Sequence, residues 1–162
     1  METNNEQQCC PEFNPTPWDN ISHVWNDKLF IKDSISQVFH IPLPGQFSKV
    51  LTKMWKKAQD AGASPDVKDF LCLAYDPSPW KSELYMLVTK EVPDTENVKL
   101  SGTFLSKVFD GPYSAIPKFI KEMDKHVAAQ DKKVKKYYFY FTTCPKCAKK
   151  YGHNYIVAFA EV

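Results

Sequence analysis

The sequence predicts an α+β fold in which one strand-helix-strand-strand unit occurs twice. The segment Ser36-Gln-Val-Phe-His40 matches Ser106-Lys-Val-Phe-Asp110 at an offset of 70, and Lys90-Glu-Val92 matches Ala160-Glu-Val162 at the same offset. Between these anchors, strand-like alternation and helical spacing follow one another in the same order. Because one helix covers one face of a sheet, we expect an antiparallel sheet with the helices packed on one side and a seam between the repeats.

The first repeat, residues 28–92, combines three predicted strands with one predicted helix. Apolar residues alternate with polar ones over Lys28–Ile41, which predicts a strand. Apolar residues recur at helical spacing over Gln46–Ala61, which predicts a helix with one buried face. Two further strands are expected at Phe70–Tyr75 and Leu84–Val92, because both stretches are apolar and a turn rich in proline and serine joins them.

The second repeat, residues 98–162, follows the same order. Alternation over Lys99–Phe109 predicts its first strand, and helical spacing over Ala115–Ala129 predicts its helix. The aromatic stretch Tyr137–Thr143 and the apolar stretch Tyr155–Val162 then predict a closing hairpin. The two repeats together form one predicted domain.

Residues 1–27 form a predicted extended arm in front of this domain. Prolines interrupt the arm, and most of its other residues are polar. Three aromatic residues stand within it, and we expect them to dock onto the body of the domain. These residues are Phe13, Trp18 and Trp25.

The positive charge of the chain is unusual, because its 162 residues include 21 lysines and no arginine. Arginine supplies the planar fork that binds phosphates and guanine edges in a bidentate manner, so those forms of recognition are excluded. A net charge of +2 is too small to indicate a nucleic-acid surface. The sequence shows neither a signal peptide nor an apolar run of membrane length, so we expect a cytoplasmic protein with no nucleic-acid or membrane partner.

Four of the five cysteines form two close pairs. Cys144 and Cys147 form a Cys-Pro-Lys-Cys knuckle, in which two thiolates have the spacing to bind one tetrahedral metal. Cys9 and Cys10 are the natural second pair for a structural zinc, with His153 as a substitute ligand. Free cytosolic thiols or a redox dithiol are the alternatives.

The duplicated unit and the segment Phe109-Asp-Gly-Pro-Tyr113, which leads into the second helix, resemble the gyrase-inhibitor-like (GyrI-like) family of small-molecule-binding domains. The resemblance covers Lys28 to Val162. It implies that a lipophilic and often cationic molecule binds in the seam, against aromatic walls and a carboxylate. Some members are fused to DNA-binding domains and some stand-alone members are described as hydrolases. This chain has no helix-turn-helix segment, which argues against a regulator.

The candidate site residues are aromatic residues and glutamates that the resemblance places near the seam. Tyr138 and Tyr140 share one face of their strand, and buried tyrosine hydroxyls would orient a ligand. The two glutamates lie 70 positions apart, and burial would fit either one to bind a cation or to act as a general base. Strand-end charges exposed to water are the alternative. The predicted ligand-binding residues are Tyr113, Tyr138, Tyr140, Trp80 and Tyr85, and the predicted catalytic residues are Glu161 and Glu91.

Three functions remain open from the sequence. The first is a stand-alone protein that binds a lipophilic, neutral or cationic small molecule between the two repeats. The second is a hydrolase in the same pocket, in which a buried glutamate activates water and tyrosine hydroxyls stabilise the developing charge. The third is a zinc-stabilised or thiol-redox protein without a pocket function. The motifs of serine hydrolases, metalloproteases and nucleotide-binding loops are absent, and the four histidines are scattered.

Overall fold

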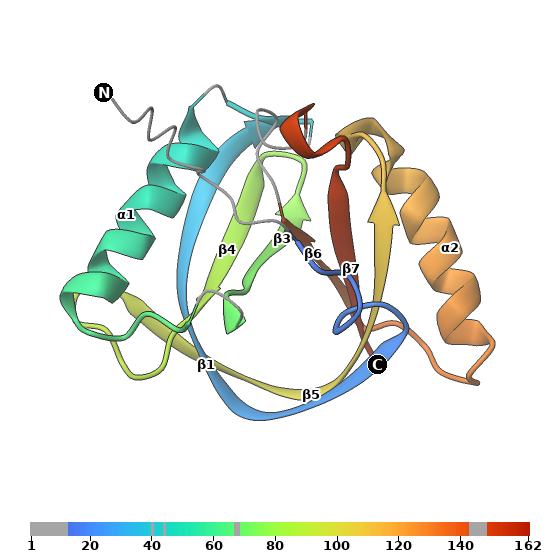
Figure 1. Ribbon diagram of the computed structural model, residues 1–162, viewed down its shortest axis with the longest axis horizontal. Helices are drawn as coiled ribbons and strands as arrows, with labels where there is room; N and C mark the ends of the chain where they lie inside the picture. The colour runs from blue at the N-terminus through green and yellow to red at the C-terminus, as the bar shows by residue number, and fades with distance from the viewer. Residues whose placement is uncertain (1–12, 40, 44, 67–68, 143–148) are drawn as a thin grey trace, which may run out of the picture.

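A computed structural model describes residues 13–39, 41–43, 45–66, 69–142 and 149–162. Its elements alternate strands and helices in the predicted order (Figure 1). They are β1 (Ile21–Val38), β2 (Ile41–Pro42), α1 (Gln46–Asp60), β3 (Cys72–Ser78), β4 (Lys81–Leu87), β5 (Glu96–Asp110), the short 3-10 helix η2 (Tyr113–Ala115), α2 (Ile116–Ala128), β6 (Lys136–Phe141) and β7 (Tyr155–Glu161).

The strands form one antiparallel sheet that closes on itself. Its order is β2-β1-β4-β3-β6-β7-β5, and β1 also pairs with β5. The β3–β6 junction has the single paired position Ala74↔Phe139, whereas β1 and β5 pair over most of their length. The predicted antiparallel α+β fold is therefore confirmed, and the closure of the ring is an additional feature of the structure.

The closure depends on the length and the bend of β1 and β5, which curve together beneath the other strands (Figure 1). The register of this pair shifts between Trp25 and Lys28, which marks a β-bulge. Asp27 at the bulge has a φ of 51°, and its backbone N–H donates to Ser101 Oγ at 2.8 Å. Gly102, which pairs with Trp25, has a φ of 139°. Both strands therefore bend at the same paired positions, next to the bulge.

We expect Gly102→Ala to lower the free energy of unfolding by about 1–2 kcal/mol, because a φ of this sign is unfavourable for residues with a Cβ. The added Cβ would lie 3.7 Å from the Phe104 ring, which is ordinary contact, so the backbone conformation rather than a clash causes the loss. Urea denaturation measures the effect, with Ser22→Ala at an exposed position of the paired strand as the control. Equal stability of the two variants would contradict this account of the bend.

Both helices lie on the outer face of the curved sheet (Figure 1). Met54 and Ala58 of α1 are buried against one part of the sheet, and Phe119, Met123 and Val127 of α2 against another. The inner face has a separate core of ten buried residues. These are Trp25, Phe30, Leu71, Leu73, Tyr85, Phe104, Tyr138, Tyr140, Val157 and Phe159.

The predicted boundaries differ most at β1 and β4. β1 begins at Ile21 and includes the last part of the predicted arm, because residues 21–25 pair with β5. β4 ends at Leu87 instead of Val92, since Val88 and Thr89 donate their backbone N–H groups to Leu29 and to Ala63. No helix in the described part of the chain has the length and apolar character of a membrane span.

Candidate functional site

Three of the predicted ligand-binding tyrosines lie inside the closed sheet. Tyr85 and Tyr138 pack with their ring centroids 5.9 Å apart, and Phe104 lies 6.1 Å from Tyr138. Tyr140 packs against Trp18, at 6.0 Å between ring centroids. All three tyrosines are less than a tenth exposed. These aromatic side chains therefore fill the interior of the closed sheet.

One end of this interior is polar. Tyr85 Oη donates a hydrogen bond of 2.6 Å to Glu83 Oε2, and Lys32 Nζ lies 3.4 Å from Glu83 Oε1. Burial acts to raise the pKa of Glu83, but the Tyr85 hydroxyl and the Lys32 ammonium outweigh it and lower the pKa overall. Burial and the adjacent carboxylate raise the pKa of Tyr85. Glu83 is thus held as a carboxylate by groups that already use both of its oxygens.

The two predicted catalytic glutamates do not come together. Glu161 is half-buried at the end of β7 and pairs with Phe104 of β5. Together with burial, which is the larger cause, its charge raises the pKa of Tyr138 to about 12. Glu91 is exposed beyond the end of β4. Phe30 of β1 pairs with Leu87 of β4, and Phe104 of β5 pairs with Glu161 of β7. Phe104 follows Phe30 by 74 positions, and Glu161 follows Leu87 by the same number. Leu87 is therefore the structural counterpart of Glu161.

Trp80 and Tyr113 lie outside the inner core. Trp80 is 55% exposed in the turn between β3 and β4, where it packs on Phe39 at 5.0 Å between ring centroids. Tyr113 lies in η2 and packs on Phe141 at 5.4 Å. Burial raises the pKa of Tyr113 to about 12. The structure therefore brings Tyr85, Tyr138 and Tyr140 together, with Glu161 near Tyr138, and leaves Glu91, Trp80 and Tyr113 elsewhere.

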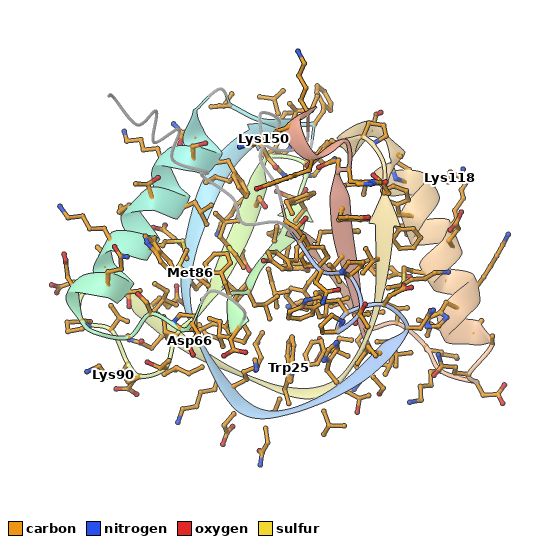
Figure 2. All side chains as sticks on the ribbon, viewed as in Figure 1. Trp25, Asp66, Met86, Lys90, Lys118 and Lys150 are labelled. Carbon is orange, nitrogen blue, oxygen red and sulfur yellow. The ribbon has the colours of Figure 1, made fainter. Side chains whose placement is uncertain are left out.

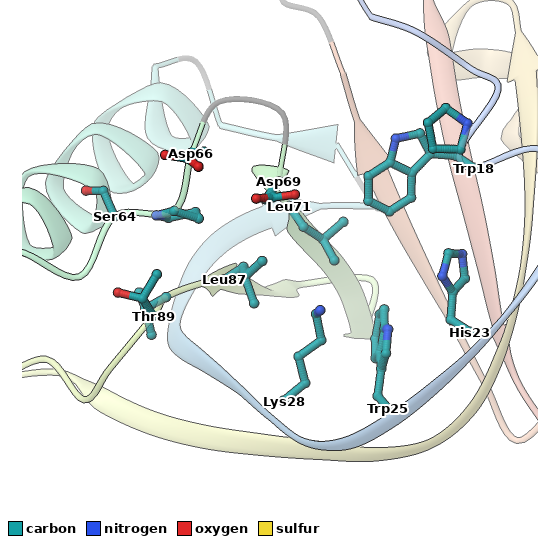
Figure 3. Close-up of a pocket in the computed structure, with 13 residues that line it drawn as sticks. Trp18, His23, Trp25, Lys28, Ser64, Asp66, Asp69, Leu71, Leu87 and Thr89 are labelled. Atoms are coloured by element: carbon teal, nitrogen blue, oxygen red, sulfur yellow. The ribbon is translucent and has the colours of Figure 1, made fainter.

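A groove of about 580 Å³ opens at the other end of the interior (Figure 3). Its aromatic wall comes from the segment before β1 and from β1 itself, and its opposite rim comes from the loop that follows α1. Leu71 and Leu87 lie between them, joined by a backbone hydrogen bond of 2.9 Å. The aromatic wall consists of Trp18, His23 and Trp25; the rim includes Ser64, Asp66 and Asp69.

The bulge in β1 explains why both Trp25 and Lys28 line the groove. Side chains alternate between the two faces of a regular strand, so residues three apart would point to opposite faces. The extra residue at the bulge restores Lys28 to the face that Trp25 occupies. Figure 2 shows Trp25 rising from β1 into the interior, while Lys118 points outward from α2. Lys28 Nζ lies 5.5 Å from the centroid of the Trp25 ring.

The groove carries charges of both signs. Lys28 extends from β1 toward the middle of the groove, and Asp66 and Asp69 stand on the opposite rim (Figure 3). Within the described part of the chain no carboxylate forms an ion pair with Lys28. A backbone hydrogen bond of 2.9 Å from Asp69 to Asp66 holds the rim. A ligand in the groove would therefore meet a cation near the indoles and two carboxylates across from them.

His23 is a groove residue that the sequence analysis did not name as a candidate site residue. Its Nε2 lies 2.7 Å from Ser106 Oγ, and that hydroxyl donates to the Trp18 carbonyl at 2.6 Å. Burial, and secondarily the charge of Lys28, lowers the pKa of His23. The signal available in the sequence was the alternation of Ile21, His23 and Trp25, which marks them as one face of a strand.

The four cysteines of the predicted zinc site, Cys9, Cys10, Cys144 and Cys147, lie outside the described residues, so the zinc site stays a prediction. His153, the predicted substitute ligand, lies within the described part of the chain. Its Nδ1 is 2.8 Å from Asp110 Oδ2, and its ring stacks on Tyr155. The hydrogen bond from His153 and the backbone N–H of Asn154 lower the pKa of Asp110. Among the described residues no group of three or more metal-binding side chains is assembled.

The fold and the groove define a closed antiparallel α+β domain with a small-molecule-sized groove at one end. The entire chain, residues 1–162, matches the family described as bacterial hydrolase, and it belongs to that family. No curated protein matches it.

Two solved structures are similar to this one. An uncharacterized conserved protein from Listeria innocua has a TM-score of 0.61 at 9% identity, over 86% of this chain and 90% of that chain, which shows a shared fold. SAV2435 bound to tetraphenylphosphonium has a TM-score of 0.48 at 10% identity, over 88% of this chain and 92% of that chain.

Proposed function

We propose that this protein binds a lipophilic, neutral or cationic small molecule in the groove that Trp18 and Trp25 line on one side and Asp66 and Asp69 on the other. The observation that carries the proposal is the groove itself. Its volume of about 580 Å³ is in the range of small-molecule sites, and it combines indole faces with a small number of charged groups. The interior of the closed sheet is already filled by aromatic and aliphatic side chains, so the ligand would sit at its open end.

The charges define how such a ligand would lie. A flat apolar body would pack on the indoles, where aromatic contacts add to the burial of apolar area. A cationic group would point to Asp66 and Asp69, because Lys28 repels it from the opposite side. A neutral ligand would use the same indoles without requiring the rim.

Matched aromatic probes test this arrangement by calorimetry. We expect naphthylmethyl-trimethylammonium and the neutral naphthylmethanol both to bind the wild-type chain. Asp69→Asn should weaken the cation by about two- to fivefold, the size of an exposed charge contact, and leave the neutral probe unchanged. Asp131→Asn, at an exposed position away from the groove, is the matched control. The proposal fails if neither probe binds, and the assignment of the rim fails if Asp69→Asn affects both probes equally.

A second function, hydrolysis of a small molecule bound in the same groove, is favoured by membership of a family described as bacterial hydrolase. Hydrolysis needs a group that accepts a proton from water and a group that stabilises developing negative charge. The groove offers an imidazole and an ammonium group for these two tasks, His23 and Lys28. Release of naphthol from naphthyl acetate, followed by absorbance, tests for this activity.

A further inference from the structure

The two ring nitrogens of His23 have different surroundings. The Trp18 carbonyl oxygen can only accept, so the Ser106 hydroxyl, 2.6 Å away, donates its proton to that oxygen. The remaining lone pairs of Ser106 Oγ then face His23 Nε2 at 2.7 Å. Nε2 must therefore carry a proton and donate it to Ser106. In a neutral ring, this leaves the lone pair on Nδ1.

The ring is also held in place, and its neutral form is favoured. Its centroid lies 5.8 Å from that of Trp18, 6.0 Å from that of Trp25 and 5.6 Å from that of Phe159. Burial and the nearby Lys28 lower the pKa of His23, which favours the neutral imidazole. Among the described residues nothing forms a hydrogen bond with Nδ1. A fixed imidazole with an unused lone pair thus stands in the wall of the groove.

We propose that His23 Nδ1 is the proton acceptor for hydrolysis of a neutral ester in this groove, an inference that rests on the second function proposed above. Water gives a proton to Nδ1 while its oxygen forms a bond to the ester carbonyl carbon, and the carbonyl oxygen becomes an oxyanion. The oxyanion then reforms the carbonyl, the bond to the leaving oxygen breaks, and that oxygen takes the proton back from Nδ1. The products are a carboxylic acid and an alcohol.

Lys28 fits the negative charge that develops in this step. Its ammonium extends into the same groove and, within the described part of the chain, has no carboxylate as an ion-pair partner. Its charge would stabilise an oxyanion, and it is also the second cause, after burial, that lowers the pKa of His23. Asp66 and Asp69 line the opposite rim of the groove, and their negative charges oppose the effect of Lys28 on an oxyanion and on His23.

Ser106 is a positioning residue in this arrangement. It is fully buried and its proton is committed to the Trp18 carbonyl, so it does not act as a nucleophile. Its role is to accept a hydrogen bond from the Nε2–H group of His23, which leaves the lone pair of the neutral ring on Nδ1. A positioning role of this kind predicts a change of tautomer when the hydroxyl is removed, which a merely structural role would not produce.

Nuclear magnetic resonance of the nitrogen-labelled full chain tests the tautomer without any substrate. We expect the Nε2–H form of His23 near neutral pH and a midpoint of titration below the usual value of about 6.5. Ser106→Ala should produce a mixture of tautomers. A proton on Nδ1, or an imidazolium near neutral pH, would overturn the proposal.

Kinetics with naphthyl acetate test the catalytic role. We expect kcat/KM to rise with pH through the midpoint measured for His23, because only the neutral ring accepts a proton. His23→Gln should lower kcat/KM by about a hundredfold or more, the usual effect of losing a general base. His126→Gln, which alters a histidine on the outer helix α2, should leave it unchanged. A folded His23→Gln variant with the wild-type rate would refute the assignment.

Two further outcomes separate this inference from the proposals on which it depends. A burst of naphthol with an acetyl group located on His23 would show that the ring itself attacks the ester, and would replace the general-base role. Absence of turnover by the wild-type chain would overturn both hydrolysis and the role of His23. The calorimetric binding of the naphthyl probes would then still decide the binding function independently.

Discussion

Phe104→Ala is expected to lower the free energy of unfolding by about 3–5 kcal/mol, the range for a fully buried aromatic side chain. Phe104 is 1% exposed and extends from β5 into the inner core, of which it is a member. Its ring centroid is 4.2 Å from that of Trp25 and 6.1 Å from that of Tyr138. Removing it would leave a cavity that strands closed into a ring cannot easily collapse to fill.

Urea denaturation followed by circular dichroism measures this loss. Val24→Ala is the matched control, because Val24 is 78% exposed on the strand that pairs with β5, and its change should stay within about 0.5 kcal/mol. Phe104→Ala with a loss below about 1 kcal/mol would mean that the interior is not packed as described.

Trp18→Ala is expected to weaken binding of naphthylmethyl-trimethylammonium by about tenfold or more, since aromatic anchors of this kind commonly contribute more than 1.4 kcal/mol. Trp18 is half-buried and lines the groove, whereas Trp25 is buried in the core. Replacing Trp18 therefore removes contact area for the ligand while most of the core stays in place.

Calorimetry compares this variant with Trp80→Ala, which removes an exposed indole outside the groove. The control should bind the probe as the wild-type chain does. A Trp18→Ala variant that keeps both its fold and its affinity would locate the ligand elsewhere. Loss of affinity in Trp80→Ala instead would place the binding site at the exposed pair of Phe39 and Trp80.

Much of the fold could be predicted because its elements carry strong periodicity. The helical spacing over Gln46–Ala61 predicted α1 to within one residue at each end. The alternation over Tyr137–Phe141 predicted the strand β6 and placed Tyr138 and Tyr140 on one face, and both lie in the inner core. These patterns are local, and burial on one face is sufficient to explain them.

The closure of the sheet could not be predicted from local periodicity. It depends on pairing between β1 and β5, which are far apart in the chain, and on a bulge that no local pattern revealed. Because the bulge changes the face on which Lys28 lies, simple alternation gave no reason to place Lys28 beside Trp25. The groove follows from this bend, and so none of its residues was predicted as a site residue; Trp18 and Trp25 were expected only to dock onto the domain.

The candidate glutamates show a related limit. An offset of 70 residues aligned Glu91 with Glu161, whereas the strand ladders align Leu87 with Glu161. Short sequence matches do not report the loop lengths that separate strands from helices. A difference of a few residues is enough to move one glutamate from a strand into an exposed turn.

We propose that a small aromatic molecule binds in the groove, against the wall that Trp18, His23 and Trp25 form. The chain has four tryptophans, so its indole N–H groups give four signals in a nitrogen-labelled magnetic resonance spectrum. Titration with naphthylmethyl-trimethylammonium should shift the signals of Trp18 and Trp25 in a saturable manner and leave those of Trp55 and Trp80 in place. Shifts confined to Trp80, or no saturable shift at any indole, would contradict the account.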